Sequence, residues 1–531
     1  MTTQNSNFDF YSSKGNKSIW LPSLMPSVTR EVNANQEPWD VDNGINIIRD
    51  GNNIKITTDN FGTTPVYFDE INKIFKNDVN ELDTKIDTVE NIDQVAFWEG
   101  VIFDYSFLGR TLNNGVVQIE GGSHFNYNVE LANWNTKRWN YFNSREFIDI
   151  TPDEAINLID SRLQTLCKEY WKILPSNGRI LLPLSGGLDS RLLALHLATT
   201  GDPNRIEAVT FGYSMSSFEY RIANQVAKAL GIKNHKFHQL DHHHFLDRAD
   251  EFWSLSQGNL SVLHSHLFSF LKANKPENTL LVTGFYCDPI AGYAAQEISE
   301  DFNSIELKDS KVYARLNLEC ERLDVKDSIR DQILGDLTKL FVDWKENKPL
   351  HGFDEYIYQS QRQAKTFSPL LQIYRTFCPV ATPFADPMLV KMFIGLPYAL
   401  RKEKNIIRRL ISYRNRELSK IFDISSSIST SNIASQVRAY LRLWITRASM
   451  SLNIFSNDRI RLISPYLTED LFGSMRKESF DEINKVCEKL LSLGIISKTQ
   501  HAKLNKKALN SKDAAIQARF ITFAPFLRKF Y

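Results

Sequence analysis

The chain of 531 residues has few cysteines, no long apolar run and almost no net charge. Its five cysteines are Cys167, Cys287, Cys320, Cys378 and Cys487. They lie far apart without a C-x-x-C pair, which argues against a zinc site and against a disulfide framework. The 63 basic and 62 acidic residues give a formal net charge of +1. Nothing in this balance favours binding to nucleic acid or to a membrane surface.

Two other features that would direct the chain to a membrane are missing. No apolar stretch approaches the ~18 residues of a membrane-spanning helix. The first residues, Met1–Phe8, contain no basic region followed by an apolar one, so they do not read as a secretory signal. We therefore expect a cytoplasmic protein that contacts neither a membrane nor nucleic acid.

Composition divides the chain into three regions. Residues 1–148 are rich in Asn, Asp, Thr and Gly, and their short alternating runs predict strands and turns. A helix start at Thr151, with Pro and early carboxylates, opens residues 149–424, where apolar strands alternate with amphipathic helices. This alternation predicts a parallel sheet with ligands at the carboxyl ends of its strands. Residues 425–531 begin with a Ser/Thr-rich stretch that predicts a mobile loop, and then become helix-rich.

The most informative segment is Arg179–Ala198. Six mostly apolar residues predict a buried strand, Ser185-Gly-Gly-Leu-Asp-Ser190 predicts a tight turn, and a leucine-rich helix follows. Backbone N–H groups and the helix dipole would converge at this turn, which suits a phosphate. Asp189 would repel phosphate unless a divalent cation lay between them. The combination indicates magnesium pyrophosphate. The alternative is an ordinary Ser-Gly turn between strand and helix.

This loop lacks the lysine of a Walker A motif. It resembles the pyrophosphate loop of the ATP pyrophosphatases, which cleave ATP between the α and β phosphates and include asparagine, argininosuccinate, GMP and NAD synthetases. Further segments are similar to the asparagine synthetase type, in matching order over about residues 150–415. They are Val209–Tyr213, Thr283-Gly-Phe-Tyr-Cys-Asp-Pro-Ile-Ala-Gly-Tyr293, Thr382-Pro-Phe-Ala-Asp386, Leu396-Pro397 and Lys404-Asn-Ile-Ile-Arg408.

The N-terminal region is similar to the glutaminase domain of the same family. Asp59–Phe68 resembles its D-R-x-G-x-x-P-L-Y-Y turn, and Glu120-Gly-Gly-Ser-His124 resembles a segment near its end. A working glutaminase of this type carries a nucleophilic cysteine at position 2, where this chain has Thr2. The resemblance therefore implies an α/β protein with three parts. These are a degenerate, Ntn-hydrolase-like class II glutaminase domain of α+β fold, an adenine-nucleotide α-hydrolase-like synthetase domain with a parallel sheet, and a helical C-terminal extension.

The resemblance also implies which residues hold ATP and Mg²⁺. Ser185, Gly186, Gly187 and Ser190 would hold pyrophosphate, and Asp189 and Asp288 would hold the metal. Lys404 would reach the transferring phosphate or the acyl intermediate, with Arg408 one helical turn further on the same face. Pro183, Phe211 and Gly284 match the strand ends that contact adenine. For Pro183 and Phe211, a packing role is an equal alternative. The alternative for Lys404 is a place on a solvated basic face, and the alternative for Asp288 is that of a turn residue. Arg191 is either a cation near phosphate or an exposed charge.

One departure concerns the amine half of the reaction. Phe285 replaces the glutamate of the family's S-G-E-G-x-D-E segment, and Pro289 replaces its last acid. The related β-lactam synthetases carry Tyr at the first place, and Phe can neither transfer protons nor form an ion pair.

We therefore expect an ATP-dependent, AMP-forming carbon–nitrogen ligase that joins a small-molecule or peptide carboxylate to an amine without hydrolysing glutamine. β-Lactam synthetases and lasso-peptide cyclases are relatives of this kind. The alternatives are an asparagine synthase that uses glutamine or ammonia, and a catalytically silent nucleotide-binding partner subunit. The sequence is compatible with a partner subunit or a homo-oligomer.

Overall fold

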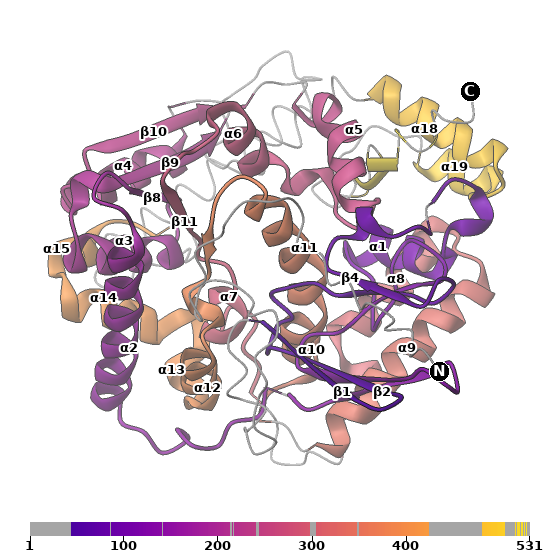
Figure 1. Ribbon diagram of the computed structural model, residues 1–531, viewed down its shortest axis with the longest axis horizontal. Helices are drawn as coiled ribbons and strands as arrows, with labels where there is room; N and C mark the ends of the chain where they lie inside the picture. Colours follow the sequence, from indigo (N-terminus) through magenta and orange to yellow (C-terminus); the bar gives the residue numbers. More distant parts are fainter. Residues whose placement is uncertain are drawn as a thin grey trace, which may run out of the picture.

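The computed structural model describes residues 44–423 and 480–504, with gaps at 85, 141, 213–214, 216, 241–243, 298–303 and 348–349, and single positions between 516 and 527 (Figure 1). The architecture is mixed α/β, with antiparallel sheets in the N-terminal region and a five-stranded parallel sheet in the middle of the chain. This confirms the α/β class. The predictions for Thr2 and for the Ser/Thr-rich stretch 425–435 lie outside the described residues.

The N-terminal region forms two antiparallel sheets that pack face to face. Their strand orders are β1-β2-β6-β7 and β4-β3-β5. The rings of Phe68 and Phe75 from one sheet contact Phe125 and Tyr127 from the other, with Phe68 and Phe125 centroids 5.4 Å apart. The elements are β1 (Ile45–Asp50), β2 (Asn53–Thr58), β3 (Tyr67–Asp69), β4 (Ile74–Lys76), η2 (Val79–Glu81), η3 (Val89–Asn91), α1 (Gln94–Phe103), β5 (Val116–Gln118), β6 (Ser123–Asn128) and β7 (Asn133–Arg138).

The parallel sheet has the order β10-β9-β8-β11-β12. Successive residues of β8, β9 and β11 are buried, so both faces of the sheet are covered, as a nearly continuous apolar strand requires. The chain runs from β8 outward to β10 and then returns to place β11 on the other side of β8. The strands are β8 (Arg179–Pro183), β9 (Ile206–Gly212), β10 (Asn234–Gln239), β11 (Thr279–Val282) and β12 (Val380–Ala381). Where the strand order reverses in this way, a parallel sheet has a crevice, here between the carboxyl ends of β8 and β11.

Helices surround this sheet, and α2 begins at a capping box of Thr151 and Glu154, where the sequence predicts it. α2, α3 and α14 pack against one another, as Figure 1 shows at its left side. The helical elements from α2 to α7 are α2 (Pro152–Ile173), α3 (Leu188–Thr200), η4 (Pro203–Arg205), α4 (Phe218–Ala229), α5 (His244–Ser256), η5 (Val262–His264), α6 (His266–Asn274) and α7 (Cys287–Ala291).

The region after residue 300 is largely helical. One helical rod runs from Phe353 to Arg375 and contains a π-helical turn, η8, between α10 and α11. Its elements are η7 (Leu307–Asp309), α8 (Lys311–Leu323), α9 (Asp327–Glu346), α10 (Phe353–Ile357), η8 (Tyr358–Arg362), α11 (Gln363–Arg375), η9 (Pro383–Ala385), α12 (Pro387–Gly395), α13 (Tyr398–Arg401), η10 (Lys402–Lys404), α14 (Asn405–Arg414) and α15 (Arg416–Lys420).

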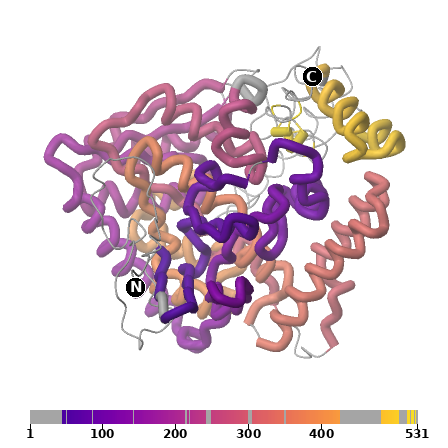
Figure 2. Tube along the Cα trace, turned by 45° about the vertical axis from the view of Figure 1, so that its right-hand side comes forward, coloured from indigo at the N-terminus to yellow at the C-terminus, as the bar shows by residue number. Residues whose placement is uncertain are grey.

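Residues near the end of the chain pack on earlier parts of it. α19 (Lys498–Leu504) lies beside α8, α18 (Phe480–Ser492) packs on α19, and the Gln500 amide donates to the Asp324 carbonyl at 2.8 Å (Figure 2). Arg519 is buried and donates to the carbonyls of Gly100, Asp104 and Gly258. Among the described residues, no helix is both long and apolar enough to cross a membrane.

A buried ion pair fixes the segment that leads into η10. The Arg401 guanidinium donates to the Glu355 carboxylate in α10, and neither side chain is exposed. Arg401 also donates to the Ile290 carbonyl at 3.3 Å and to the His351 ring. Gly292 has a left-handed φ of 95°, and a Cβ there would lie 2.2 Å from the Arg401 carbonyl oxygen. The two backbones are therefore in direct contact.

We predict that Glu355→Gln destabilises the protein by about 3–5 kcal/mol, because a buried guanidinium loses its counter-charge. A lower midpoint of urea unfolding, followed by circular dichroism, measures this. Glu417→Gln is the control, since the pair of Glu417 with Lys420 is exposed and its loss should leave the midpoint nearly unchanged. Equal midpoints for the two variants would contradict the assignment.

Candidate functional site

The Ser185–Ser190 loop lies at the crevice between β8 and β11. β8 ends at Pro183, and α3 begins at Leu188 with Gly187 as its N-cap. The Ser190 hydroxyl accepts from the Ser185 amide at 3.1 Å, and the two serine Oγ atoms lie 3.0 Å apart. The Gly187 amide donates to Ser185 Oγ at 3.2 Å. The serines thus close the loop onto itself and set its shape ahead of a helix N-terminus.

The Arg191 side chain points to backbone carbonyls of the loop and of residues 421–422. Its side chain is buried, and it donates to the carbonyls of Gly186, Ile421 and Phe422 at 2.7–3.2 Å. Burial lowers the pKa of this guanidinium. The expectation of an exposed charge is therefore wrong. The alternative, a cation near phosphate, stays a prediction, since the guanidinium contacts the loop at the Gly186 carbonyl.

The centre of the candidate site is Lys404, which contacts two carboxylates. Its Nζ donates to both Asp189 oxygens at 2.8 and 2.7 Å and forms an ion pair with Asp288. Lys404 is 6% exposed, Asp189 18% and Asp288 43%, so the cluster is open on the Asp288 side. The two carboxylates come from the elements that follow β8 and β11, as the parallel topology predicts.

The electrostatics of this cluster follow from burial and close charges. Burial raises the pKa of Asp189 to about 6; Lys404 opposes this rise and the charge of Asp288 adds to it. Burial lowers the pKa of Lys404, but the two carboxylates outweigh it and raise that pKa above its ordinary value. Lys404 is therefore a permanent cation at neutral pH.

The backbone around Lys404 differs from the sequence prediction. Glu403 and Lys404 have left-handed φ angles of 54° and 59°, and α14 begins only at Asn405. The prediction that Lys404 and Arg408 share a helix face is wrong, because Lys404 precedes the helix. Arg408 instead donates to the Glu403 carbonyl and to the Asp423 carboxylate, the latter at 3.2 Å. The structure does not bring Arg408 into the Lys404 cluster.

The three residues matched to adenine-contacting strand ends lie at the same edge of the sheet. Pro183 pairs with Val209 of β9, and Phe211 lies two residues further along β9. A Cβ on Gly284 would lie 3.5 Å from the Asp189 Cβ, so Gly284 is directly against the loop. Phe211 also packs on His266 with ring centroids 5.2 Å apart, which fits the packing alternative as well.

The two substituted acid positions are occupied by packing residues. The Phe285 ring stacks on Phe367 of α11, with centroids 4.5 Å apart. Pro289 is buried, and its carbonyl accepts from Gln359 at 2.9 Å. Neither position therefore supplies a group that could accept a proton from an amine.

The donor set fits a magnesium ion. Two carboxylates, Asp189 and Asp288, converge on one ammonium, and the raised pKa of Asp189 reflects burial together with the nearby second carboxylate. Mg²⁺ is commonly bound by one or two carboxylates, with phosphate oxygens and water completing its shell. Within the described ranges, no group of three or more His, Cys, Asp or Glu side chains forms a complete protein cage.

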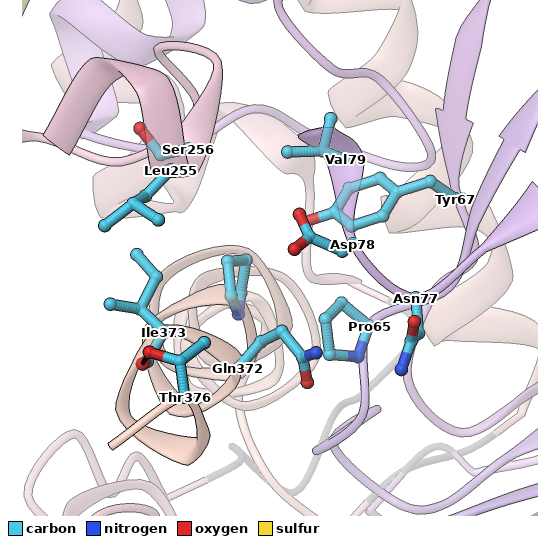
Figure 3. Close-up of a pocket in the computed structure, with 11 residues that line it drawn as sticks. Pro65, Tyr67, Asn77, Asp78, Val79, Leu255, Ser256, Gln372, Ile373 and Thr376 are labelled. Carbon is cyan, nitrogen blue, oxygen red and sulfur yellow. Dashed lines mark hydrogen bonds between the residues drawn. The ribbon is translucent and has the colours of Figure 1, made fainter. Parts of the chain in front are cut away.

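A separate cavity of ≈ 20 Å³ lies away from this cluster (Figure 3). Tyr67 and Asp78 lie on one side of it, and Gln372, Ile373 and Thr376 of α11 and its end lie on the other. This volume holds about one water molecule. The cavity belongs to the junction of the N-terminal region with α11, and none of the candidate site residues lines it.

Comparison with known families agrees with the position of the loop. The family model described as asparagine synthase matches residues 174–271. This segment includes β8, the Ser185–Ser190 loop and the strands β9 and β10, whereas Asp288 and Lys404 lie beyond it. No curated protein matches the chain. The match supports an asparagine synthase-like family, and with it an ATP-dependent amide ligase or synthetase in general.

Sequence reasoning missed Tyr358, which interacts electrostatically with Asp288 and Lys404, and its neighbour Arg362. They lie in the π-helical turn η8, and the Arg362 guanidinium donates to the Tyr358 hydroxyl at 3.0 Å. Tyr358 and Arg362 are four residues apart, so on a helix they lie on the same face. This spacing could have identified the pair from the sequence.

We predict that all five thiols are inert toward an alkylating reagent in the native protein. The five cysteines are buried, burial raises the pKa of each, and the Cys287 thiol faces Asp189. A thiolate is needed for alkylation. Mass spectrometry after iodoacetamide at pH 8 should find no label on native protein and all five labelled in urea. Rapid native labelling of Cys287 would contradict the packing of this site.

Proposed function

We propose that the protein is an ATP-dependent, AMP-forming amide ligase that activates a carboxylic acid as an acyl-adenylate. The observation that carries this proposal is the convergence of Lys404, Asp189 and Asp288 beside the Ser185–Ser190 loop. A serine-glycine loop at a helix N-terminus, two carboxylates and one buried ammonium suit a nucleotide that loses pyrophosphate. The asparagine synthase match over the same loop supports it.

The proposed reaction has two steps. A carboxylate oxygen of the substrate attacks the α-phosphorus of ATP, and the bond from that phosphorus to the pyrophosphate oxygen breaks. An amine then attacks the acyl carbon, loses a proton and displaces AMP. Negative charge grows on the leaving groups, so catalysis is mainly positioning and charge compensation. The amides and hydroxyls of Ser185–Ser190 would bind pyrophosphate.

Lys404 has the position and charge for the first step. Its ammonium already contacts both carboxylates, and it can exchange one of these partners for a phosphoryl oxygen. Asp189 and Asp288 would hold Mg²⁺, which supplies positive charge beside the β and γ phosphates when bound. Pro183, Phe211 and Gly284 would border the adenosine. Arg408, whose guanidinium donates to Asp423, would act only by helping to position η10, the turn that contains Lys404.

The amine in this proposal does not come from glutamine. Phe285 stacks on Phe367 at the position of the family's acid, so it provides no proton acceptor for ammonia. We propose that the N-terminal sandwich is a glutaminase-like domain without glutaminase activity, and that the amine belongs to a small-molecule or peptide substrate. Phe285 disfavours asparagine synthesis, the main alternative. Residues 1–148, 149–424 and 425–531 would be the three parts of such a ligase.

We predict that Asp189→Asn, Asp288→Asn and Lys404→Met each lower acid-dependent ATP–pyrophosphate exchange by about 10²–10³-fold, because each removes a charge at the phosphates. Exchange is measured with radiolabelled pyrophosphate and a panel of carboxylic acids.

The matched controls make the same kinds of substitution, Lys to Met and Asp to Asn, at positions outside the cluster. Lys402→Met removes an exposed lysine two residues from Lys404, and Asp331→Asn removes an exposed carboxylate in α9. Both should exchange at the native rate. If the native protein shows no ATP–pyrophosphate exchange with any acid of the panel, that result favours a silent nucleotide-binding subunit. Full exchange activity of Asp189→Asn would exclude the metal assignment.

We predict an acid limb in the pH dependence of exchange near pH 6. Burial raises the pKa of Asp189 to about 6, so the charged carboxylate is present above this pH and is lost below it. Cys287→Ala should move the limb to higher pH, because the thiol hydrogen bond lowers the pKa of Asp189. The titration of ATP itself cannot cause that shift. A limb near the ordinary aspartate value of about 4 would contradict the assignment.

A further inference from the structure

Tyr286 has an unusual backbone conformation two residues before Asp288. Its φ is left-handed, at 69°, and it is the N-cap of α7. For a bulky residue this conformation is rare, because the Cβ crowds the backbone. The S-G-E-G-x-D-E segment that this stretch resembles has glycine at the same place, and glycine adopts a positive φ freely. A tyrosine stays in such a conformation only where the surrounding structure holds it there.

The Tyr286 side chain is anchored on the N-terminal region. It is 1% exposed, and its ring stacks on the Phe61 ring with centroids 4.6 Å apart. The Tyr286 hydroxyl lies 3.2 Å from Ser368 Oγ in α11, and this Oγ donates to the Phe61 carbonyl at 3.3 Å. Burial raises the pKa of Tyr286, so the phenol keeps its proton and can donate it to Ser368. The ring and the hydroxyl thus both connect Tyr286 to Phe61.

Phe61 in turn lies in a tightly closed connection between β2 and β3, one strand from each sheet of the N-terminal sandwich. The buried Asp59 carboxylate accepts from the amides of Phe61 and Thr63, each at 3.0 Å. A Cβ on Gly121 would lie 2.3 Å from the Phe61 carbonyl carbon, so two backbones are in direct contact here. Arg375 of α11 donates to the Thr63 carbonyl at 3.0 Å. The ring that receives Tyr286 is therefore a fixed part of the fold.

The turn around Tyr286 also belongs to the candidate site. Its first residue, Gly284, lies against the Ser185–Ser190 loop, and the Gly284 carbonyl accepts from the Cys287 amide at 3.3 Å. Asp288 follows and forms the ion pair with Lys404. The Asp288 side chain is 43% exposed, so packing around the carboxylate itself holds it only in part. Its position depends on the backbone that precedes it.

We propose that Tyr286 is a positioning residue for Asp288: its side chain, anchored on Phe61, holds the turn in the conformation that brings this carboxylate to Lys404. The N-terminal sandwich then supports the metal end of the ligase site, which is a role separate from glutamine hydrolysis. This inference rests on the proposed role of Asp288 in binding Mg²⁺. Without the anchor, the backbone at position 286 would leave the left-handed region and turn Asp288 away from Asp189.

The first test needs neither metal nor nucleotide. Cys287 is buried beside Tyr286, so alkylation of its thiol reports whether the turn stays closed. Tyr286→Gly permits the left-handed conformation without enforcing it, and Phe61→Leu removes the stacking partner. In both variants iodoacetamide should label Cys287 about tenfold or more faster than in the native protein, while the other four cysteines stay protected. Tyr286→Phe keeps the ring and should keep most of the protection.

The matched control for Phe61→Leu is Phe75→Leu. Phe75 is also a buried ring of the N-terminal sandwich, but it stacks on Phe68, with centroids 4.6 Å apart. Its substitution weakens the core of the sandwich and leaves the anchor of Tyr286 in place. Cys287 should therefore remain protected in this variant.

The second test measures the metal. Calorimetry with the full chain and α,β-methylene-ATP, which cannot release pyrophosphate, gives the Mg²⁺ concentration at which nucleotide binding is half-maximal. Tyr286→Gly and Phe61→Leu should raise this concentration about tenfold, because loss of a group that orients a metal ligand costs about 10–100-fold in affinity. Tyr286→Phe and Phe75→Leu should stay near the native value. The double variant of Tyr286→Gly and Phe61→Leu should be no weaker than Tyr286→Gly alone, since both act through one contact.

The outcomes separate this inference from the proposed function. An unchanged Mg²⁺ requirement in Tyr286→Gly would overturn the positioning role, whether or not Cys287 becomes reactive. In exchange assays, saturating Mg²⁺ should restore most of the rate of Tyr286→Gly, whereas Asp288→Asn should stay slow. A raised Mg²⁺ requirement in Tyr286→Gly, together with a native protein that exchanges with no acid, would overturn the ligase and leave the role of Tyr286 standing.

Discussion

The arrangement of the site depends on the buried ion pair of Arg401 and Glu355. Arg401 ends α13, three residues before Lys404, and Glu355 lies in α10 at the start of the helical rod that carries Arg362. Arg401 also reaches the carbonyl of Ile290 in α7, the helix that carries Asp288. One guanidinium thus connects the segments that supply the ammonium of Lys404, the carboxylate of Asp288 and the Phe367 ring on which Phe285 stacks. Their convergence is a consequence of a charge that cannot be left unpaired in the protein interior.

The Lys404 cluster also balances the charges of two neighbouring carboxylates. Two carboxylates close to each other repel, and burial makes their charge costly, as the raised pKa of Asp189 reflects. Lys404 offsets both the repulsion and the cost of burial, because its ammonium pairs with both carboxylates. The same ammonium would compete with a metal for these carboxylates. In the proposed ligase, binding of nucleotide and metal would therefore be coupled to a change in the partners of Lys404.

Local patterns predicted much of the sheet and its loop, because strand, glycine turn and helix start are written in neighbouring residues. A strand precedes the Ser185–Ser190 turn and a helix follows it, α2 begins at the expected cap, and Asp189 and Asp288 meet as parallel strand ends should. The errors concern tertiary contacts. Arg191 is buried against the carbonyls of Ile421 and Phe422, which lie 230 and 231 positions further along the chain. Lys404 lies outside the helix because tertiary packing holds Glu403 and Lys404 in left-handed conformations. The roles assigned to these residues and the three domain boundaries stay predictions.

The packing of Arg519 against α1 has a consequence for the order in which the chain matures. Arg519 and Gly100 are 419 positions apart, and a Cβ on Gly100 would lie 3.1 Å from the guanidinium. At about 5–20 residues per second, a ribosome needs on the order of 20–80 s to pass from one to the other. During that interval the N-terminal sandwich can form, while the surface of α1 that receives Arg519 stays open. Translation therefore sets the earliest time at which Arg519 can dock on α1 and complete the packing around Gly100.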